Sequence, residues 1–378
     1  MIKKILKSLF VLLVIILSFA VIFVLTLQIF EYRPADETVL EIENNLDDLS
    51  SNYVVLDESI RILTFNTGYA SLSETEDFAM DGGTKGRMDS EAEVSLNIDG
   101  ISSILTNSNA DIYLLQEVDV DSNRSYNTLQ YSIYSELLSM SVTLGYNYRC
   151  IFVPFPFTFG QMMGSVNSGI VSFINYNVDE ATRYQLPGSF SWPISLANLK
   201  RCIVVSRLAI ADSDQFLIVI NVHLSAYDDG TMRLQEMEAL KEIMKDETDA
   251  GNYVIVGGDF NQTFPDAVEI LPSIDNGIDS FSYNYYYELK DQDFWQAYPM
   301  EEDWFLENDF QFGIDLSTPS CRLLNKAYDT QNQESNQYYL IDGFIVSSNI
   351  EIESVETLNE NFKYSDHNPV QIEIKLIP

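Results

Sequence analysis

Both histidines of this 378-residue chain lie in short polar motifs. His223 ends the apolar run 220–223, and His367 follows Asp366 just before the last apolar run. Imidazole is suited to proton transfer near neutral pH, and a neighbouring aspartate fixes its tautomer and stabilises its charged form. A single histidine is more often a hydrogen-bonded structural residue. Because the only two histidines both fall in such motifs, we expect them to share one catalytic site.

Oxygen-bearing side chains end several other apolar runs. They are Asn66, Glu117, Asp259 with Asn261, and Asp342. Taken singly, each is better explained as a solvated strand end or a turn residue. A hard cation such as Mg²⁺ prefers oxygen ligands, however, and the carboxylates of Glu117 and Asp366 with the amide of Asn66 are suitable donors.

The combined set fits the hydrolysis of a phosphodiester. That reaction needs an in-line attacking water, neutralisation of charge on the phosphoryl oxygens and help for the leaving oxygen. A divalent cation, the carboxylates and the two imidazoles can supply these functions. The sequence therefore predicts a phosphoester hydrolase that depends on a divalent metal.

Short runs rich in Val, Ile, Phe and Tyr predict the strands that position these side chains. The runs are 60–66, 111–117, 169–174, 202–210, 216–223, 253–257, 340–346 and 370–376. Helical spacing of apolar residues marks two longer segments, 94–105 and 237–244. Neighbouring strands are joined by short polar turns, which is typical of antiparallel hairpins. We therefore expect an α+β fold, a sandwich of two mostly antiparallel sheets with helices outside.

The N-terminal segment is predicted to anchor the chain in a membrane. Three lysines within residues 3–7 precede an uncharged apolar run at about residues 8–30, near the ~20 residues that span a bilayer. Cleavage as a signal peptide is the alternative, since residues 18–20 resemble a weak site, but the run continues beyond them. The lysines should stay cytoplasmic, so we expect a single-pass protein of the cell membrane whose catalytic domain is extracytoplasmic.

Three regions follow from this division of the chain. Residues 1–31 hold the cytoplasmic lysines and the transmembrane anchor. Residues 32–58 are acidic and weakly periodic, which suggests a spacer that is partly helical. Residues 59–378 form the catalytic domain, which we expect to act as a monomer.

Composition restricts the partners of this domain. The chain has a formal net charge of −36, and from Glu31 onward 18 basic residues face 57 acidic ones, a charge of −39. Tight binding to nucleic acid usually needs a basic surface, so we expect no tight binding of nucleic acid by this domain. The spacing of Cys150, Cys202 and Cys321 matches no zinc motif, and Cys202 is expected to be a buried apolar residue.

The ordered motifs resemble the endonuclease/exonuclease/phosphatase superfamily, which includes deoxyribonuclease I and neutral sphingomyelinases. The similarity covers roughly residues 59–378. The matching segments, in order, are 64–66, 116–117, 167–170, 222–224, 258–261, 341–343 and 365–367. The Gly-Asp-Phe-Asn segment at 258–261 and the Ser-Asp-His segment at 365–367 are the most specific. The resemblance implies a four-layer α/β sandwich.

The same resemblance implies a role for each residue of the set. Glu117 would bind a catalytic Mg²⁺ or Mn²⁺, with Asn66 and Asp366 beside it. Asp259 would orient or deprotonate the attacking water, and Asn261 would hold a phosphoryl oxygen. His367, with Asp342 behind it, would contact the scissile phosphate. His223 would stabilise the transition state or protonate the leaving group, and Asn167 would face the phosphate.

Two features remain open at this stage. Members of the superfamily with a histidine like His223 usually pair it with a further carboxylate, for which Asp119 and Asp121 are candidates. The stretch 68–88 is either a wall of the substrate pocket or a surface insertion.

Three functions are compatible with the sequence. The first is hydrolysis of a lipid headgroup or another small extracellular phosphoester, which fits the anchor, and the aromatic segment 151–159 would touch lipid or form a core strand. The second is a surface-attached nuclease, against which the acidity counts. The third is a non-catalytic binding module, against which the complete set of charged groups counts.

Overall fold

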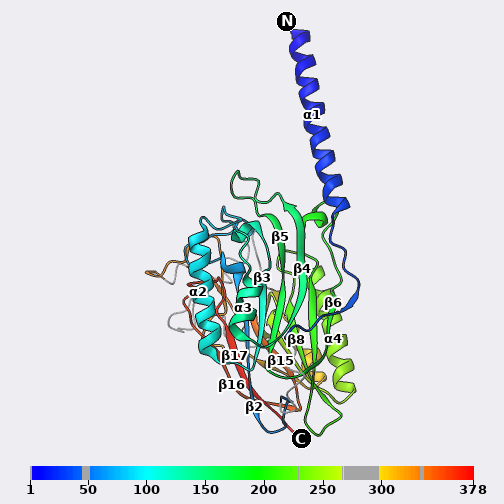
Figure 1. The fold of residues 1–378 in the computed structure, drawn as a ribbon, viewed down its shortest axis with the longest axis vertical. Coiled ribbons are helices and arrows are strands. Elements are labelled where there is room, and N and C mark those ends of the chain that lie inside the picture. The colour runs from blue at the N-terminus through cyan, green and yellow to red at the C-terminus, as the bar shows by residue number, and fades with distance from the viewer. Residues whose placement is uncertain (1, 45–51, 229, 266, 268–297, 333–335) are drawn as a thin grey trace.

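The computed structural model describes residues 2–44, 52–228, 230–265, 267, 298–332 and 336–378. It begins with α1 (Ile2–Ile29), a helix long and apolar enough to cross a membrane, whose most apolar stretch is not buried against the chain. Figure 1 shows α1 rising from one end of a folded domain, with the C-terminus at the opposite end.

Seven strands form a first sheet, sheet A. In spatial order they are β1 (Glu37–Val39), β6 (Val178–Gln185), β7 (Cys202–Ala209), β8 (Phe216–His223), β9 (Tyr253–Asp259), β15 (Asp342–Ser347) and β12 (Phe310–Gly313). β8 and β9 run parallel, and the other neighbours run antiparallel. The predicted hairpin is formed by β7 and β8.

Six strands form a second sheet, sheet B. Their order is β16 (Ile350–Thr357), β17 (Val370–Leu376), β2 (Ser59–Asn66), β3 (Ile112–Asp119), β5 (Gly164–Ile174) and β4 (Ser141–Val153). β2 and β3 are parallel, and the other pairs are antiparallel. Short strands pair outside the two sheets, β10 (Gln262–Thr263) with β11 (Tyr298–Pro299) and β13 (Cys321–Arg322) with β14 (Tyr338–Tyr339).

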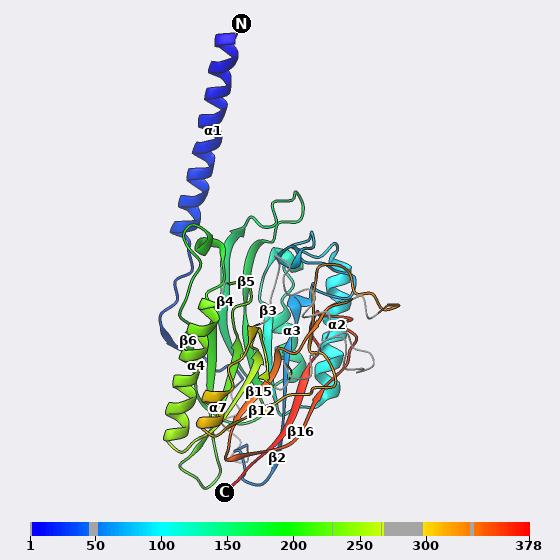
Figure 2. The ribbon, with the colours of Figure 1, turned by 180° about the vertical axis from the view of Figure 1, so that it is seen from behind.

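Helices cover the outer faces of both sheets. They are α2 (Glu91–Ser108), α3 (Gln130–Leu138), α4 (Thr231–Asp249) and α7 (Asp303–Glu307), with single turns η1 (Gly68–Ala70), η2 (Ala79–Asp81), η3 (Asn123–Ser125) and η4 (Ile194–Ala197). Figures 1 and 2 show α2 and α4 on opposite sides of the strands.

Side chains that alternate between the two faces of each strand explain the layers of the fold. On β8, Leu217 and Val219 belong to the core between the sheets, whereas Ile218 and Ile220 pack with α4. On sheet B, Leu63 packs with α2. Each such buried side chain contributes roughly 1.5–3 kcal/mol relative to exposure. The predicted α+β fold, a four-layer sandwich preceded by an apolar helix, is confirmed.

The acidic segment before the domain is packed against it in its described part. Residues 37–39 pair antiparallel with β6, and Leu40 and Ile42 contact the core between the sheets. The segment therefore contributes the short edge strand β1 and two apolar contacts where composition suggested a partly helical spacer. Residues 45–51 of that segment lie outside the described residues.

All eight predicted strands are present, but several more were missed. β16 carries four exposed polar residues, and β6 is rich in polar residues of which Asp179 and Glu180 are exposed. Their apolar content alone is too low to mark a strand. β4 was not among the predicted strands, and only its C-terminal end overlaps the aromatic segment 151–159, for which a core strand was one alternative.

Candidate active site

Three neighbouring strands of sheet A place His223, Asp259 and Asp342 side by side. His223 on β8 is in register with Asp259 on β9, which is in register with Asp342 on β15. Side chains in register on adjacent strands point to the same face of a sheet. All three are buried, with at most 3% of their surface exposed.

Glu117 reaches this place from sheet B because β3 is irregular there. The register with β5 shifts between Leu115 and Val118, and Glu117 has a positive φ of 57°. A bulge redirects a side chain, and a left-handed conformation is costly for a residue other than glycine. The irregularity turns the partly buried Glu117 toward the cavity that also receives Asn66 from β2.

The loop before β17 supplies Asp366 and His367. Ser365 Oγ donates a hydrogen bond of 2.8 Å to the backbone oxygen of Asn66, which ties the loop to β2. His367 Nδ1 lies 2.8 Å from Asp342 Oδ2. This pair orients the ring and leaves Nε2 facing the cavity.

Asp259 is the point at which these groups meet. Its Oδ2 accepts a hydrogen bond from Asn66 Nδ2 at 3.0 Å. The same oxygen lies 3.4 Å from His223 Nε2 and 3.9 Å from His367 Nε2. Glu117 Oε1 lies 3.9 Å from His223 Nε2. Groups that are far apart in the chain therefore face one another.

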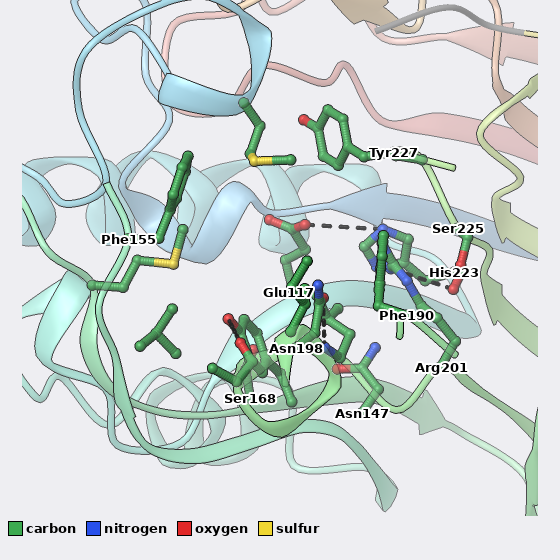
Figure 3. Close-up of a pocket in the computed structure, with 18 of the residues that line it drawn as sticks. Glu117, Asn147, Phe155, Ser168, Phe190, Asn198, Arg201, His223, Ser225 and Tyr227 are labelled. Carbon is green, nitrogen blue, oxygen red and sulfur yellow. Dashed lines mark hydrogen bonds and ion pairs between the residues drawn. The ribbon is translucent and has the colours of Figure 1, made fainter. Parts of the chain in front are cut away.

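A cavity of about 680 Å³ opens over this cluster (Figure 3). Its wall includes seven of the nine predicted site residues, namely Asn66, Glu117, His223, Asp259, Asn261, Asp366 and His367. Figure 3 shows Glu117 and His223 facing each other across the cavity, with Tyr227 and Phe155 on its walls. Asp342 stands behind His367, as the resemblance implies.

Besides Asp342, Asn167 is the other predicted residue that the wall does not include. Its neighbour Ser168 lines the cavity, and so does Asn147 on the paired strand β4. Successive residues of a strand point to opposite faces, which separates Asn167 from Ser168. Ser168 lies in the motif segment 167–170 but was not singled out as a site residue, and Asn147 was missed because it is part of no recognisable motif.

Asn261 is held by local geometry after β9. It adopts a positive φ of 50°, its backbone N–H donates to Asp259 Oδ1 at 2.9 Å, and its Nδ2 donates to the Leu224 carbonyl at 2.8 Å. Asparagine tolerates this left-handed conformation better than most residues. The Asp-Phe-Asn turn therefore fixes both polar side chains at the cavity.

Burial perturbs the titration of the cluster. Burial raises the pKa of Asp259, and the negative charge of Asp342 adds to this effect. Burial lowers the pKa of His367, but Asp342 and Asp366 outweigh it and raise that pKa well above its ordinary value. Burial, with the positive charges of Arg201 and His367, lowers the pKa of His223. His223 is therefore neutral and His367 cationic near pH 7.

The residues fit a divalent cation. Glu117 Oε2 is buried and, within the described residues, accepts no hydrogen bond. Burial raises the pKa of Asp366, and although the positive charge of His367 lowers it, the negative charge of Glu117 raises it again, so a cation between the two carboxylates would be stabilising. Oxygen donors of this kind suit Mg²⁺ or Mn²⁺. Glu117 and Asp366 would hold the ion, with Asn66 alongside.

Two compact groups could also offer ligand atoms, and neither includes Glu117. Asp259, Asp342 and His367 form one, and Cys321, Asp366 and His367 form the other, each with atoms within 4.8 Å of one another. Burial raises the pKa of the Cys321 thiol, which keeps it protonated. A protonated thiol is a poor ligand for a hard cation, so the oxygen set at Glu117 fits better.

The stretch 68–88 forms part of the cavity wall. Tyr69, Leu72, Phe78 and Met80 line the cavity. The wall is fastened by Asp81, whose carboxylate accepts hydrogen bonds from the Tyr227 hydroxyl at 2.8 Å and from the Leu324 N–H at 3.0 Å. Of the two readings left open by the sequence, the pocket wall is confirmed.

Asp119 is not the carboxylate partner of His223. It forms an ion pair of 2.9 Å with Arg124 and accepts a hydrogen bond of 2.7 Å from Ser125. His223 Nδ1 has no hydrogen-bond partner among the described residues. Arg201 lies close instead and donates to the backbone oxygen of His223 at 3.4 Å. Arg201 also lines the cavity, and no local motif marks it.

A further buried carboxyl group, outside the predicted set, lies beside the cavity. Glu236 on α4 accepts hydrogen bonds from the backbone N–H and the hydroxyl of Ser225, at 2.8 and 2.7 Å. Burial raises its pKa to about 7. The sequence offered no signal for Glu236, because a buried glutamate and an exposed glutamate on a helix cannot be told apart from the sequence.

The family of the chain follows from its sequence match. A model described as the Endonuclease/Exonuclease/phosphatase family matches residues 94–367, so the chain belongs to this family. Its members are generally phosphoester hydrolases, an activity that the site described above fits. No curated protein matches the chain significantly.

Solved structures share the fold at low sequence identity. An endonuclease/exonuclease/phosphatase from Beutenbergia cavernae is 14% identical, with a TM-score of 0.54, and the match covers 84% of this chain and 72% of that one. The human nocturnin catalytic domain, solved with bound sulfate, is 15% identical over 84% and 94% of the two chains, with a TM-score of 0.47. A mannosyl-6-phosphatase from Bacteroides thetaiotaomicron is 14% identical over 83% and 99%, with a TM-score of 0.48.

Proposed function

We propose that this chain hydrolyses a phosphodiester by in-line attack of water, as a divalent-metal-dependent enzyme that acts as a monomer at the extracytoplasmic face of a cell membrane. The observation that carries the proposal is the meeting of Asn66 and both imidazoles at Asp259 Oδ2, within 3.0–3.9 Å, at a cavity wall. A hydrolase needs such a convergence, and a solvated strand end does not produce it.

The chemistry assigns one role to each group. Asp259, held by Asn66, orients the water and accepts its proton as the water oxygen forms a bond to phosphorus. His367, kept cationic by Asp342, donates a hydrogen bond to a phosphoryl oxygen and stabilises its growing charge. The bond from phosphorus to the leaving oxygen breaks on the opposite side.

His223 faces the same space from β8. Its neutral imidazole can donate a hydrogen bond from Nε2 to the leaving oxygen and stays neutral. The leaving alkoxide takes a proton from solvent water and departs as an alcohol, and Asp259 releases to solvent the proton that it accepted from the attacking water. Arg201, next to its backbone, adds positive charge near the phosphate. The bound cation would supply charge neutralisation on the phosphoryl group.

The negative charge of the domain favours a small or lipid-borne phosphoester over a nucleic acid as the substrate. From Glu31 onward the formal charge is −39, which repels a polyanion. The exposed aromatic residues Phe157 and Phe159 near the cavity support a lipid headgroup. A surface-attached nuclease is the alternative, and a non-catalytic binding module is the second.

The test is a turnover screen with the full chain in detergent micelles. The substrates are bis(p-nitrophenyl) phosphate, phospholipids, a sugar phosphate and supercoiled plasmid, each with Mg²⁺ and with EDTA. We expect Mg²⁺-dependent release from diesters and little nicking of the plasmid. His223→Ala should reduce turnover by roughly 10²–10⁴-fold without unfolding the protein. Dominant plasmid nicking would select the nuclease, and no turnover with any substrate would select the binding module.

A further inference from the structure

Exposed apolar side chains surround the mouth of the cavity on the side of α1. They come from the tip of the β4–β5 hairpin and from the η4 segment, and are called the rim: Ile151, Phe152, Phe157, Phe159, Trp192 and Ile194. Phe159 is fully exposed and Phe157 is 82% exposed. Figures 1 and 2 both show the hairpin tip rising on the side of the domain from which α1 leaves.

The rim is attached directly to the apolar helix. The rings of Phe23 on α1 and Phe152 pack edge to face with centroids 6.1 Å apart. Trp192 Nε1 donates a hydrogen bond of 3.0 Å to Gln28 Oε1 at the end of α1. Tryptophan is enriched at the membrane–water interface, where the indole N–H finds a polar partner.

The position of these contacts along α1 determines how deep the rim would lie in a membrane that α1 spans. Gln28 is the first strongly polar side chain near the C-terminal end of the apolar run. Phe23 precedes it by five residues, which at 1.5 Å per residue is about 7 Å along the axis. If Gln28 marks the interface, Phe152 lies at the depth of the acyl chains, within the ~5–10 Å typical of interfacial apolar side chains.

The cavity itself continues from α1 to the catalytic cluster. Phe23, Val24 and Leu27 of α1 line its outer part, and His223 and Asp259 line its inner part. Leu27 is buried in an apolar cluster with the cavity residues Tyr148 and Val153 of β4 and Leu196 of η4. An apolar wall therefore leads from the helix to the polar site.

We propose that the rim inserts into the outer leaflet of the membrane spanned by α1, and that the cavity draws the phosphoester headgroup of a lipid directly from that leaflet. This inference rests on the function and membrane location proposed above. The strongly acidic domain gains nothing from an anionic surface, so the contact depends on apolar burial and holds on zwitterionic bilayers.

The first measurement tests insertion without any activity. Phe159→Cys takes an environment-sensitive fluorophore in the full chain, reconstituted in phosphatidylcholine vesicles, and the native Cys150, Cys202 and Cys321 are buried. Lipids with brominated acyl chains should quench this label at least threefold more than one placed by Ile377→Cys at the far end of the domain. Equal quenching of both labels would overturn the proposal.

The second measurement tests delivery of the substrate. Ile151→Asp with Phe159→Asp places two charges on the rim, outside the cavity wall, and Val55→Asp with Ile377→Asp is the matched control on other exposed apolar residues. We expect the rim variant to lose at least tenfold turnover of vesicle phospholipids and sphingomyelin and to keep its turnover of bis(p-nitrophenyl) phosphate. The control should keep both activities.

The outcomes separate this inference from the proposed function. Wild-type turnover of vesicle lipids by the rim variant would refute the role of the rim in substrate delivery. Wild-type turnover of the soluble diester with no vesicle lipid cleaved would refute the lipid route and leave the phosphodiesterase standing. No wild-type turnover of either substrate would refute the phosphodiesterase, and the quenching measurement would then decide membrane insertion by itself.

Discussion

Replacing Glu236 by glutamine should remove a pH dependence of stability. The side chain is buried beside the cavity and is held by two hydrogen bonds from Ser225. Glutamine has the same shape, accepts the backbone N–H and donates to the hydroxyl, so the contacts survive while the titration is lost. The variant isolates the cost of ionising this one group.

The magnitude follows from the two pKa values. Burial raises the pKa of Glu236 from 4.5 to about 7, and one pKa unit is worth about 1.4 kcal/mol. Folded protein therefore binds more protons than unfolded protein between these values, and stability falls as pH rises through that window. Relative to the variant, the wild type should lose about 3 kcal/mol between pH 4.5 and pH 7, and nothing further above pH 8.

The assay is chemical unfolding of the full chain in micelles, followed by circular dichroism, at steps from pH 4.5 to pH 8. The quantity compared is the difference in unfolding free energy between the wild type and Glu236→Gln at each pH. Glu242→Gln, which removes an exposed charge from the same helix, is the control and should track the wild type. A difference that stays constant across the window would refute the argument from burial.

Three further predictions concern the cluster and its support. Glu117→Gln should raise the Mg²⁺ concentration for half-maximal activity at least tenfold, since it removes a carboxylate charge, and an unchanged metal titration would contradict the assigned ligand. Asp342→Asn should lower kcat by roughly 10²–10⁴-fold through the loss of His367 orientation, with an unchanged circular dichroism spectrum; wild-type kcat would show that the pair is structural only. Gly258→Ala would place a Cβ 2.1 Å from the Val222 carbonyl oxygen, so a loss of roughly 2–4 kcal/mol is expected in thermal unfolding, and a wild-type melting temperature would disprove the clash.

The catalytic cluster was largely predictable because strand ends carry it. His223, Asp259 and Asp342 each end or begin an apolar run, and in-register strands convert that position into spatial proximity. The composition of the runs also set the fold, since two sheets and two amphipathic helices were visible in the sequence.

Features that depend on tertiary contact were not predictable. Tyr227 and Asp81 are 146 residues apart and meet only when the stretch 68–88 folds over the cavity. Asp119 is close to Glu117 in sequence and suggested a partner for His223. The irregularity at Glu117 and the buried ion pair with Arg124 direct Asp119 elsewhere.

The connection between α1 and β1 has a further consequence. Seven residues separate Ile29 from Glu37, a reach of at most about 25 Å even when extended. Glu31 within it forms ion pairs with Arg33 at 2.8 Å and Lys200 at 3.0 Å, which shorten it further. With α1 in a membrane, as proposed above, a connection this short would restrict the tumbling of the domain and keep it from distant targets. An anchored enzyme would then meet its substrate by lateral diffusion in the plane of the membrane. Its turnover rate would depend on the surface density of the substrate and not on the bulk concentration.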